Sequence, residues 1–301
     1  MKHSTVCPMI TPFHDDLTID YSATAAQIER LIAGGVDGFL FLGSIGEFFA
    51  LSLSERLAFL RFATRQVAGR ARVMIGAGDT VFAHTVELME DARAVGADAA
   101  VVVSPYYIGG DQACLYEYFK ALEKVANLPI ILYNFPDRTG VSIAPETVKR
   151  LSALPGIVGI KDTVDTISHT RTLFREVLPS RPEFEIYSGY DEYALVNLMG
   201  GGSGVISGLN NLAPEVFRAL LDAYEAKDFE AAERMQRRIN ALMPLYAMTT
   251  PFIQAIKVAV SRLVDGMSPA MRPLCLPLEE KTQQEIDRFV DREVTGRRAE
   301  C

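Results

Sequence analysis

The chain has 301 residues, of which 49% are hydrophobic and 23% are charged, a composition typical of a soluble globular protein. Its formal net charge of −8 argues against a nucleic-acid partner, and no apolar run reaches the roughly 18 residues that a membrane span requires. The four cysteines, at positions 7, 114, 275 and 301, have neither disulfide nor metal-ligand spacing, and the N-terminus leaves no room for a signal peptide, so we expect a cytoplasmic protein.

Short apolar segments alternate with amphipathic segments over the first two-thirds of the chain. The apolar segments predict buried strands at residues 5–10, 38–42, 72–77, 99–104, 129–134, 157–161, 184–188 and 204–207. The amphipathic segments predict helices at residues 21–33, 54–67, 80–95, 111–126, 144–151, 165–177, 191–199 and 214–226. Because single buried strands alternating with helices form parallel sheets, eight such units predict a closed (β/α)8 barrel, the TIM barrel.

The strand pattern stops after residue 226. Residues 227–247, 251–265 and 279–292 predict three helices, and residues 297–301 are expected to be frayed. We therefore predict a catalytic barrel over residues 1–226 and a helical extension over residues 227–301, packed on the barrel or on a neighbouring subunit.

The predicted strand at residues 157–161 ends in a lysine. Burial disfavours the charged form of Lys161 and favours a neutral amine, which is a nucleophile for carbonyl carbon and forms a Schiff base. Alternatively, Lys161 extends to solvent or forms a structural ion pair with Asp162. Lys257 is a rival buried lysine, but its place in an apolar helical segment favours a packing role.

Other polar residues stand at strand ends, where barrels of this class gather their catalytic groups. Tyr133 ends the strand before that of Lys161, so both side chains can point into one pocket, where a phenol can carry protons. Half-buried packing is the alternative for Tyr133. Arg138 can hold a substrate carboxylate with two nitrogens or remain a solvated loop charge.

Two glycine-rich turns are candidate anion-binding sites, and the histidines are candidate metal ligands. The turn at residues 43–46 can offer backbone N–H groups to a small carboxylate, or be a plain strand–helix turn. The run at residues 200–204 has no adjacent Lys or Arg, which favours close backbone packing over phosphate binding. Because the four histidines do not cluster at strand ends, no metal site is predicted.

Three motifs occur in order along the chain: Gly43-Ser-Ile-Gly-Glu47, Tyr133-Asn-Phe-Pro136 and Ile160-Lys-Asp162. Together they resemble the pyruvate-dependent class I aldolase superfamily, which includes dihydrodipicolinate synthase and N-acetylneuraminate lyase, and the resemblance covers essentially the whole chain. Further matches, at Lys161–Asp165 with His169, Ser188–Asp191 and Thr250–Phe252, are most similar to the 2-keto-3-deoxygluconate aldolase branch.

The resemblance implies roles for particular residues. Lys161 would form the Schiff base with a 2-oxo acid, and Tyr133 would relay protons with Ser44 and with Tyr107, which reaches in from an adjacent subunit. The remaining implied substrate-binding residues are Ile45, Gly46, Arg138, Thr163, Gly189 and Ile206. The resemblance further implies no metal or organic cofactor, and a homotetramer built as a dimer of dimers.

Two positions depart from the family pattern in opposite directions. Ile45 stands where a hydroxyl residue is usual, which removes a group from the synthase pocket, whereas Arg138 is similar to the arginine with which the synthases hold aspartate semialdehyde. We expect a lyase that cleaves or forms a 2-keto-3-deoxy sugar acid from pyruvate and an aldehyde. The alternatives are 4-hydroxy-tetrahydrodipicolinate synthase, a dehydratase of a related sugar acid, and a non-catalytic sugar-acid-binding barrel.

Overall fold

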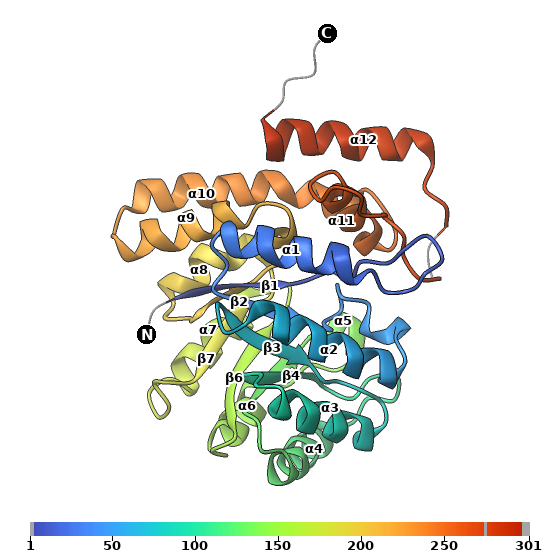
Figure 1. Ribbon diagram of the computed structural model, residues 1–301. Helices are drawn as coiled ribbons and strands as arrows, with labels where there is room; N and C mark the ends of the chain where they lie inside the picture. Colours follow the sequence, from blue (N-terminus) through green and yellow to red (C-terminus); the bar gives the residue numbers. More distant parts are fainter. Residues whose placement is uncertain (1–2, 274–275, 297–301) are drawn as a thin grey trace.

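Eight parallel strands, paired in chain order and closed by β8 against β1, form a barrel in a computed structural model that describes residues 3–273 and 276–296 (Figure 1). The predicted TIM barrel is therefore confirmed, and the predicted fraying of residues 297–301 lies outside the described residues. The strands are β1 (Ser4–Pro8), β2 (Gly38–Phe41), β3 (Arg72–Gly76), β4 (Ala99–Val103), β5 (Ile130–Asn134), β6 (Ile157–Asp162), β7 (Glu185–Ser188) and β8 (Gly204–Ile206).

Alternation along β5 shows how the strands divide the core. Ile131 and Tyr133 belong to the hydrophobic cluster inside the barrel, whereas Ile130 and Leu132 belong to the cluster between the strands and the helices. Successive side chains of a strand point to opposite faces, so a strand buried on both faces reads as a continuous apolar run. Because Lys161 pairs with Tyr133 in register, both belong to the inward face near the carboxyl ends of the strands.

Helices follow the strands and cover the barrel (Figure 1). They are α1 (Tyr21–Ala33), α2 (Leu53–Val67), α3 (Phe82–Ala94), α4 (Gln112–Val125), α5 (Pro136–Thr139), α6 (Pro145–Ser152), α7 (Ile167–Glu176), α8 (Ala194–Met199) and α9 (Pro214–Glu225).

Side-chain caps set several helix starts. Asp20 accepts the Ala23 N–H at the start of α1, and Ser52 accepts the Glu55 N–H at the start of α2. Helix α3 begins two residues later than predicted because Asp79 accepts the N–H of Val81 and turns the chain before the helix.

The glycine run before β8 allows close packing, as the sequence favours. A side chain at Gly200 would overlap the Phe174 ring, and Gly204 adopts a φ of +143° against the Ser4 carbonyl. No phosphate-binding side chain is needed to explain these glycines.

The C-terminal helices lie together on one side of the barrel, with α10 along α9 and α12 outermost (Figure 1). They are α10 (Phe229–Leu242), η4 (Met243–Ala247), α11 (Phe252–Ser261), α12 (Glu280–Val290) and the π-turn η5 (Asp291–Thr295). One hydrophobic cluster joins Phe217 of α9, Ile256 of α11 and Phe289 of α12 to Ile45 beside β2. The domain boundary at residue 226 stays a prediction.

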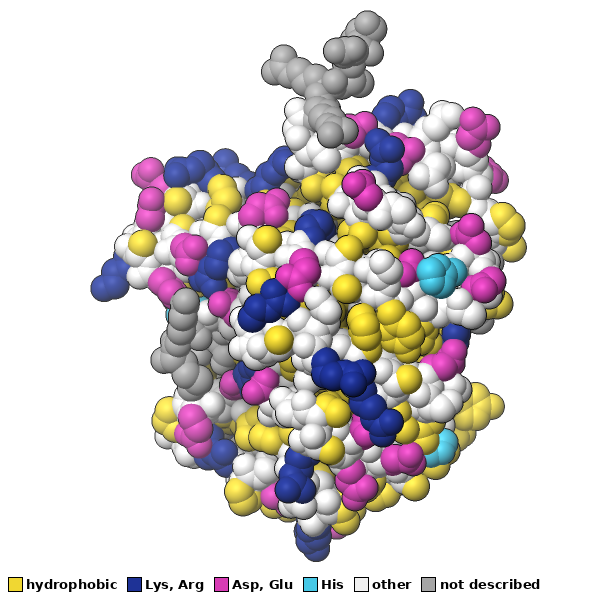
Figure 2. All heavy atoms as spheres, viewed as in Figure 1, with side chains coloured by type: hydrophobic (Ala, Val, Ile, Leu, Met, Phe, Trp, Pro, Cys, Tyr) yellow, Lys and Arg dark blue, Asp and Glu magenta, His cyan; other side chains and the backbone are white. Residues whose placement is uncertain are grey.

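The surface carries charges of both signs. On the face drawn in Figure 2, acidic and basic side chains are interspersed and form no broad patch of one sign. Within the described ranges, no helix is long and apolar enough to cross a membrane.

Candidate active site

A cavity of about 300 Å³ opens at the carboxyl ends of the strands. It is lined by Pro8, Ser44, Ile45, Tyr133, Phe135, Asp137, Arg138, Lys161, Thr163, Gly189, Tyr190, Asp191, Ile206, Gly208, Met243, Tyr246 and Phe252. Eight of the ten predicted site residues are among them, and Gly46 and Tyr107 are not. Most of the residues named from the sequence therefore meet at one cavity, and their roles stay predictions.

Lys161 and Tyr133 are neighbours across β5 and β6. Each is only 6% exposed, and Lys161 Nζ lies 4.2 Å from the centroid of the Tyr133 ring. The prediction that both side chains enter one pocket is confirmed, since both line the same cavity. The alternative in which Lys161 extends to solvent is wrong.

Asp162 has its own partners behind the strand. Its carboxylate accepts from Asn134 Nδ2 at 2.9 Å and from Thr170 Oγ1 at 2.7 Å, and it lies 2.9 Å from His169 Nδ1. Burial alone would lower the pKa of His169, but hydrogen bonding to Asp162 and its charge raise it overall. In the described part of the chain Lys161 forms no ion pair with Asp162, so the structural-pair alternative is also wrong.

The turn after β2 forms one wall of the cavity. Two non-glycine residues, Leu42 at φ +57° and Glu47 at φ +55°, bracket it, and Glu47 N–H donates to Ser44 O at 3.2 Å. Throughout residues 3–273 and 276–296, the backbone N–H groups of Ser44, Ile45 and Gly46 find no protein acceptor. Ser44 and Ile45 line the cavity, so their unsatisfied N–H groups are suited to an anion.

Gly46 itself lies behind this wall. A Cβ there would stand 3.0 Å from Met9 O, so the close approach of two backbones requires a residue without a side chain. Ile45 fills the space beside Gly208, whose Cβ would lie 2.5 Å from Ile45 Cδ1. The isoleucine therefore gives the turn an apolar face where the family pattern has a hydroxyl.

The far part of the cavity carries several polar groups. Thr163 Oγ1 is buried without a hydrogen-bond partner among the described residues. Tyr190 Oη donates to Asp137 at 3.4 Å, and burial together with nearby acidic charges raises the pKa of Tyr190 to about 12. The Arg138 guanidinium lies 5.3 Å from the centroid of the Phe135 ring, and within the described ranges it donates to the Asp137 carbonyl at 3.5 Å and to no carboxylate.

Asp191 and Tyr246 are cavity residues that the sequence analysis missed. The Asp191 carboxylate accepts from Ser207 Oγ and, at 2.9 Å, from Tyr246 Oη, and burial raises its pKa to about 6. Asp191 follows β7 closely, so the strand-end rule could have found it. Tyr246, Met243 and Phe252 come from the C-terminal extension, where no strand end marks them.

Tyr107 stands away from its own cavity. It is 92% exposed, adopts φ +74°, and is followed by Ile108, which is 78% exposed. Within this chain it therefore does not complete the site. Across the described ranges, no group of three or more His, Cys, Asp or Glu side chains is arranged to hold a metal ion.

Comparison with known proteins identifies the family. The model of the dihydrodipicolinate synthetase family matches residues 2–293. The chain belongs to this family. Members of the family are class I lyases and aldolases, and the chain is a pyruvate aldolase or lyase of this kind.

Individual relatives carry two kinds of name. The chain is 38% identical over 280 residues, 93% of each protein, to the putative 2-dehydro-3-deoxy-D-gluconate aldolase YagE of Escherichia coli K12. It is 39% identical over 267 residues, 87% of this chain and 89% of the relative, to a 4-hydroxy-tetrahydrodipicolinate synthase of Hyphomonas neptunium.

Solved structures agree with this assignment. The crystal structure of YagE from E. coli K12 in complex with pyruvate superposes with a TM-score of 0.93 at 37% identity, covering 96% of this chain and 98% of that one. The dihydrodipicolinate synthase of Thermotoga maritima gives a TM-score of 0.91 at 28% identity, covering 97% and 99%.

Proposed function

We propose that the protein is a Schiff-base-forming lyase that cleaves or forms a 2-keto-3-deoxy sugar acid, with Lys161 as the nucleophile. The observation that carries the proposal is the Lys161 amine, buried in the cavity and set over the Tyr133 ring. The unengaged N–H groups of Ser44 and Ile45, which line the cavity, are suited to the carboxylate of the 2-oxo acid.

The first stage joins substrate to enzyme. The unprotonated Lys161 amine attacks the ketone carbon C2 and forms a carbinolamine. Tyr133 gives its proton to the carbinolamine hydroxyl, which leaves as water, so a protonated imine remains. Ser44 lines the same cavity as Tyr133, so its hydroxyl is available as a second member of the proton relay.

The second stage breaks the carbon chain. The Tyr133 oxygen accepts the proton of the C4 hydroxyl, the C3–C4 electron pair moves toward the imine, and an aldehyde leaves. Protonation of the resulting enamine at C3 and hydrolysis of the imine release pyruvate and restore the Lys161 amine. In the reverse direction the enamine adds to the aldehyde. The steps require no redox partner, so we propose no organic cofactor.

The lining of the far cavity supports a hydroxylated aldehyde. Thr163 Oγ1, Asp137 and Tyr190 can exchange hydrogen bonds with substrate hydroxyls, and the partner-free Thr163 oxygen would gain one. A second substrate carboxylate would instead lie near the Asp137 and Asp191 side chains, which oppose it when ionised. We infer a polyol aldehyde on this ground.

The alternative function is 4-hydroxy-tetrahydrodipicolinate synthase. Arg138 favours it, because its guanidinium borders the cavity without an acidic partner in the described ranges and could grip a carboxylate with two nitrogens. Turnover of pyruvate with aspartate semialdehyde, compared with turnover of 2-keto-3-deoxygluconate, separates the two functions.

We further propose that the active assembly is a homotetramer in which Tyr107 enters the site of a neighbouring subunit. Its exposure, its left-handed backbone and the exposed Ile108 beside it support this, since exposed apolar pairs mark surfaces that contact other chains.

Borohydride trapping tests the central proposal. Pyruvate and borohydride should add one reduced adduct per chain, and peptide mass spectrometry should place it at Lys161. Lys161→Ala should abolish the adduct, whereas the control Lys149→Ala, which removes an exposed lysine paired with Glu176, should keep it. An adduct that persists in Lys161→Ala contradicts the assignment, and trapping of a folded Lys161→Ala chain at another lysine identifies the true nucleophile.

A further inference from the structure

A fully buried ion pair stands behind the turn at residues 43–47. Lys257 Nζ in α11 donates to Glu47 Oε1 at 2.6 Å, and both side chains are 0% exposed. Lys257 Nζ also donates to Thr11 O at 3.0 Å and lies 4.1 Å from the centroid of the Phe13 ring. Neither charged group lines the cavity, so neither can touch a substrate there.

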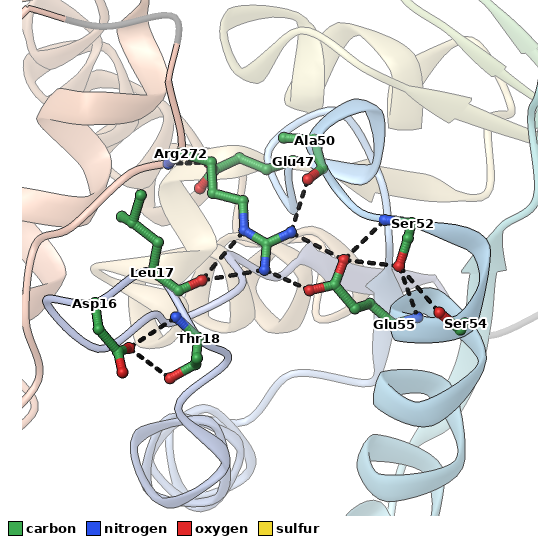
Figure 3. Close-up of polar contacts among 9 residues, drawn as sticks. All are labelled: Asp16, Leu17, Thr18, Glu47, Ala50, Ser52, Ser54, Glu55 and Arg272. Atoms are coloured by element: carbon green, nitrogen blue, oxygen red, sulfur yellow. Dashed lines mark hydrogen bonds and ion pairs between the residues drawn. The ribbon is translucent and has the colours of Figure 1, made fainter.

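A second hydrogen bond to the same carboxylate comes from the segment that follows α11. The backbone N–H of Arg272 donates to Glu47 Oε2 at 3.2 Å, so both carboxylate oxygens are held by the C-terminal extension. Figure 3 shows the Arg272 guanidinium bonded to the carbonyls of Leu17 and Ala50 and to the Glu55 carboxylate. The segment carrying Arg272 is thereby fixed to loops on both sides of the turn.

Thr11 connects this network to the turn backbone. Its Oγ1 donates to Gly46 O at 2.7 Å while its own carbonyl accepts from Lys257. The backbone of the turn is therefore anchored at two successive residues, through the Gly46 carbonyl and the Glu47 side chain. Glu47 holds its left-handed backbone, unusual for a glutamate, at the point where these anchors meet.

A buried ion pair is weak as a source of stability. Taking two charges out of water costs several kcal/mol per ion in typical proteins, and burial raises the pKa of Glu47 despite its cationic partner. An apolar pair of similar volume would pack the same space at less cost, whereas charged groups joined by hydrogen bonds fix direction as well as distance. The chemistry of the pair therefore suits positioning.

We infer that Lys257 and Glu47 are positioning residues that hold the N–H groups of Ser44 and Ile45 for the substrate carboxylate. This inference rests on the proposed function, because it takes the turn as the carboxylate site. Lys257 belongs to the C-terminal extension, which contributes no strand end. Through the ion pair with Glu47, the extension determines how strongly the site prefers ketones that carry a carboxylate over ketones that do not.

The test compares pyruvate with acetone, which has the same reactive carbonyl but no carboxylate. We expect Glu47→Gln/Lys257→Met, which removes both charges together, to raise at least tenfold the pyruvate concentration that gives half-maximal borohydride trapping. Trapping of acetone should change less than twofold. The control Arg72→Met/Glu185→Gln removes an ion pair between β3 and β7, away from the cavity, and should leave both values unchanged.

Further variants separate positioning from folding. Lys257→Arg keeps the charge and should recover most of the affinity for pyruvate. If the double variant does not fold, Arg272→Gln, which removes only the hydrogen bonds of the guanidinium, is tested in its place. It should raise the pyruvate concentration for half-maximal trapping by a smaller factor and leave the value for acetone unchanged. The inference is overturned if, in either variant, the concentration for half-maximal trapping rises by the same factor for pyruvate and for acetone. A wild-type chain that traps neither ketone overturns the proposed function itself.

Discussion

Lys161 and Tyr133 are register partners on β6 and β5, and the lysine nitrogen stands over the ring of the tyrosine at 4.2 Å from its centroid. The contact places a cation or a nucleophilic amine against the π face, while the phenol oxygen remains a separate group. We therefore assign the ring and the hydroxyl different tasks: the ring would fix the position of Nζ, and the hydroxyl would carry protons.

The first prediction separates these two tasks. Tyr133→Phe keeps the ring and removes only the hydroxyl, so we expect kcat to fall by about 10²–10⁴, the usual contribution of a positioned acid–base group. Trapping of pyruvate at equilibrium should persist, because the lysine and the anion-binding turn are intact. The control Tyr224→Phe removes a hydroxyl that bonds the Leu198 carbonyl away from the cavity and should not change kcat. A Tyr133→Phe chain with wild-type kcat contradicts the proton-relay role.

The second prediction concerns Gly189, which lies against Lys161. A Cβ there would overlap Thr163 Oγ1 and stand 3.2 Å from Lys161 Cε. We expect Gly189→Ala to displace both side chains, to lower the stability by roughly 1–3 kcal/mol, as overpacking does, and to lower kcat/KM more than tenfold. Thermal unfolding and initial rates measure the two effects. Gly109→Ala, where the nearest neighbour of the new Cβ is 3.7 Å away, is the matched control.

The third prediction tests whether Tyr107 serves a neighbouring subunit. Lys161→Ala and Tyr107→Ala should each be nearly inactive alone. Coexpressed, they should form mixed assemblies in which a subunit with an intact Lys161 receives an intact Tyr107 from its partner, so activity should rise well above that of either parent. A coexpressed sample with only the average of the parental activities contradicts the shared site, and light scattering measures the subunit number.

The barrel and the centre of its site were predictable because both follow from local signals. Apolar runs with bounding glycines mark the strands, and the residues that end the runs mark the edge at which the cavity opens, which is why Lys161 and Tyr133 could be placed in one cavity. Thr163, which the family resemblance implied, lines the same cavity, and the roles of all three stay predictions. Helix α3 begins two residues after its predicted start because the Asp79 side chain closes a turn there. The hydrophobic pattern at these residues is already that of a helix, so it could not show the turn.

The remaining parts depend on contacts between segments far apart in the chain. Tyr246 and Phe252 line the cavity because the C-terminal extension packs beside β8 and β1. The hydrophobic periodicity of residues 227–301 predicts helices, but it does not predict the side of the barrel on which these helices pack. The ion pair between Lys257 and Glu47 joins residues 210 positions apart in the chain. The apolar segment around Lys257 indicated that this lysine is buried, but it could not indicate which residue is its partner.

The last prediction concerns Asp191, whose pKa is raised by burial from 3.8 to about 6. Because the folded state holds this proton more tightly than the unfolded chain, the stabilising contribution is complete below pH 3.8 and is lost as the pH rises through about 6. A shift of this size corresponds to about 3 kcal/mol, of which roughly half is lost between pH 5 and pH 8. Carboxylates with lowered pKa values, such as Glu55, change stability in the opposite direction, so wild type alone cannot isolate the effect.

Asp191→Asn isolates it, because the amide has nearly the same shape and does not ionise. The free energy of unfolding of the variant minus that of wild type should become more positive by about 1.5 kcal/mol between pH 5 and pH 8, as ionisation of Asp191 destabilises only the wild type. Urea unfolding at fixed protein concentration measures the difference at each pH. Asp228→Asn, which alters an exposed helix cap, serves as the control and should show a nearly constant difference. A pH-independent difference for Asp191→Asn would mean that the carboxyl keeps its ordinary pKa, and that the Ser207 and Tyr246 hydrogen bonds compensate its burial in full.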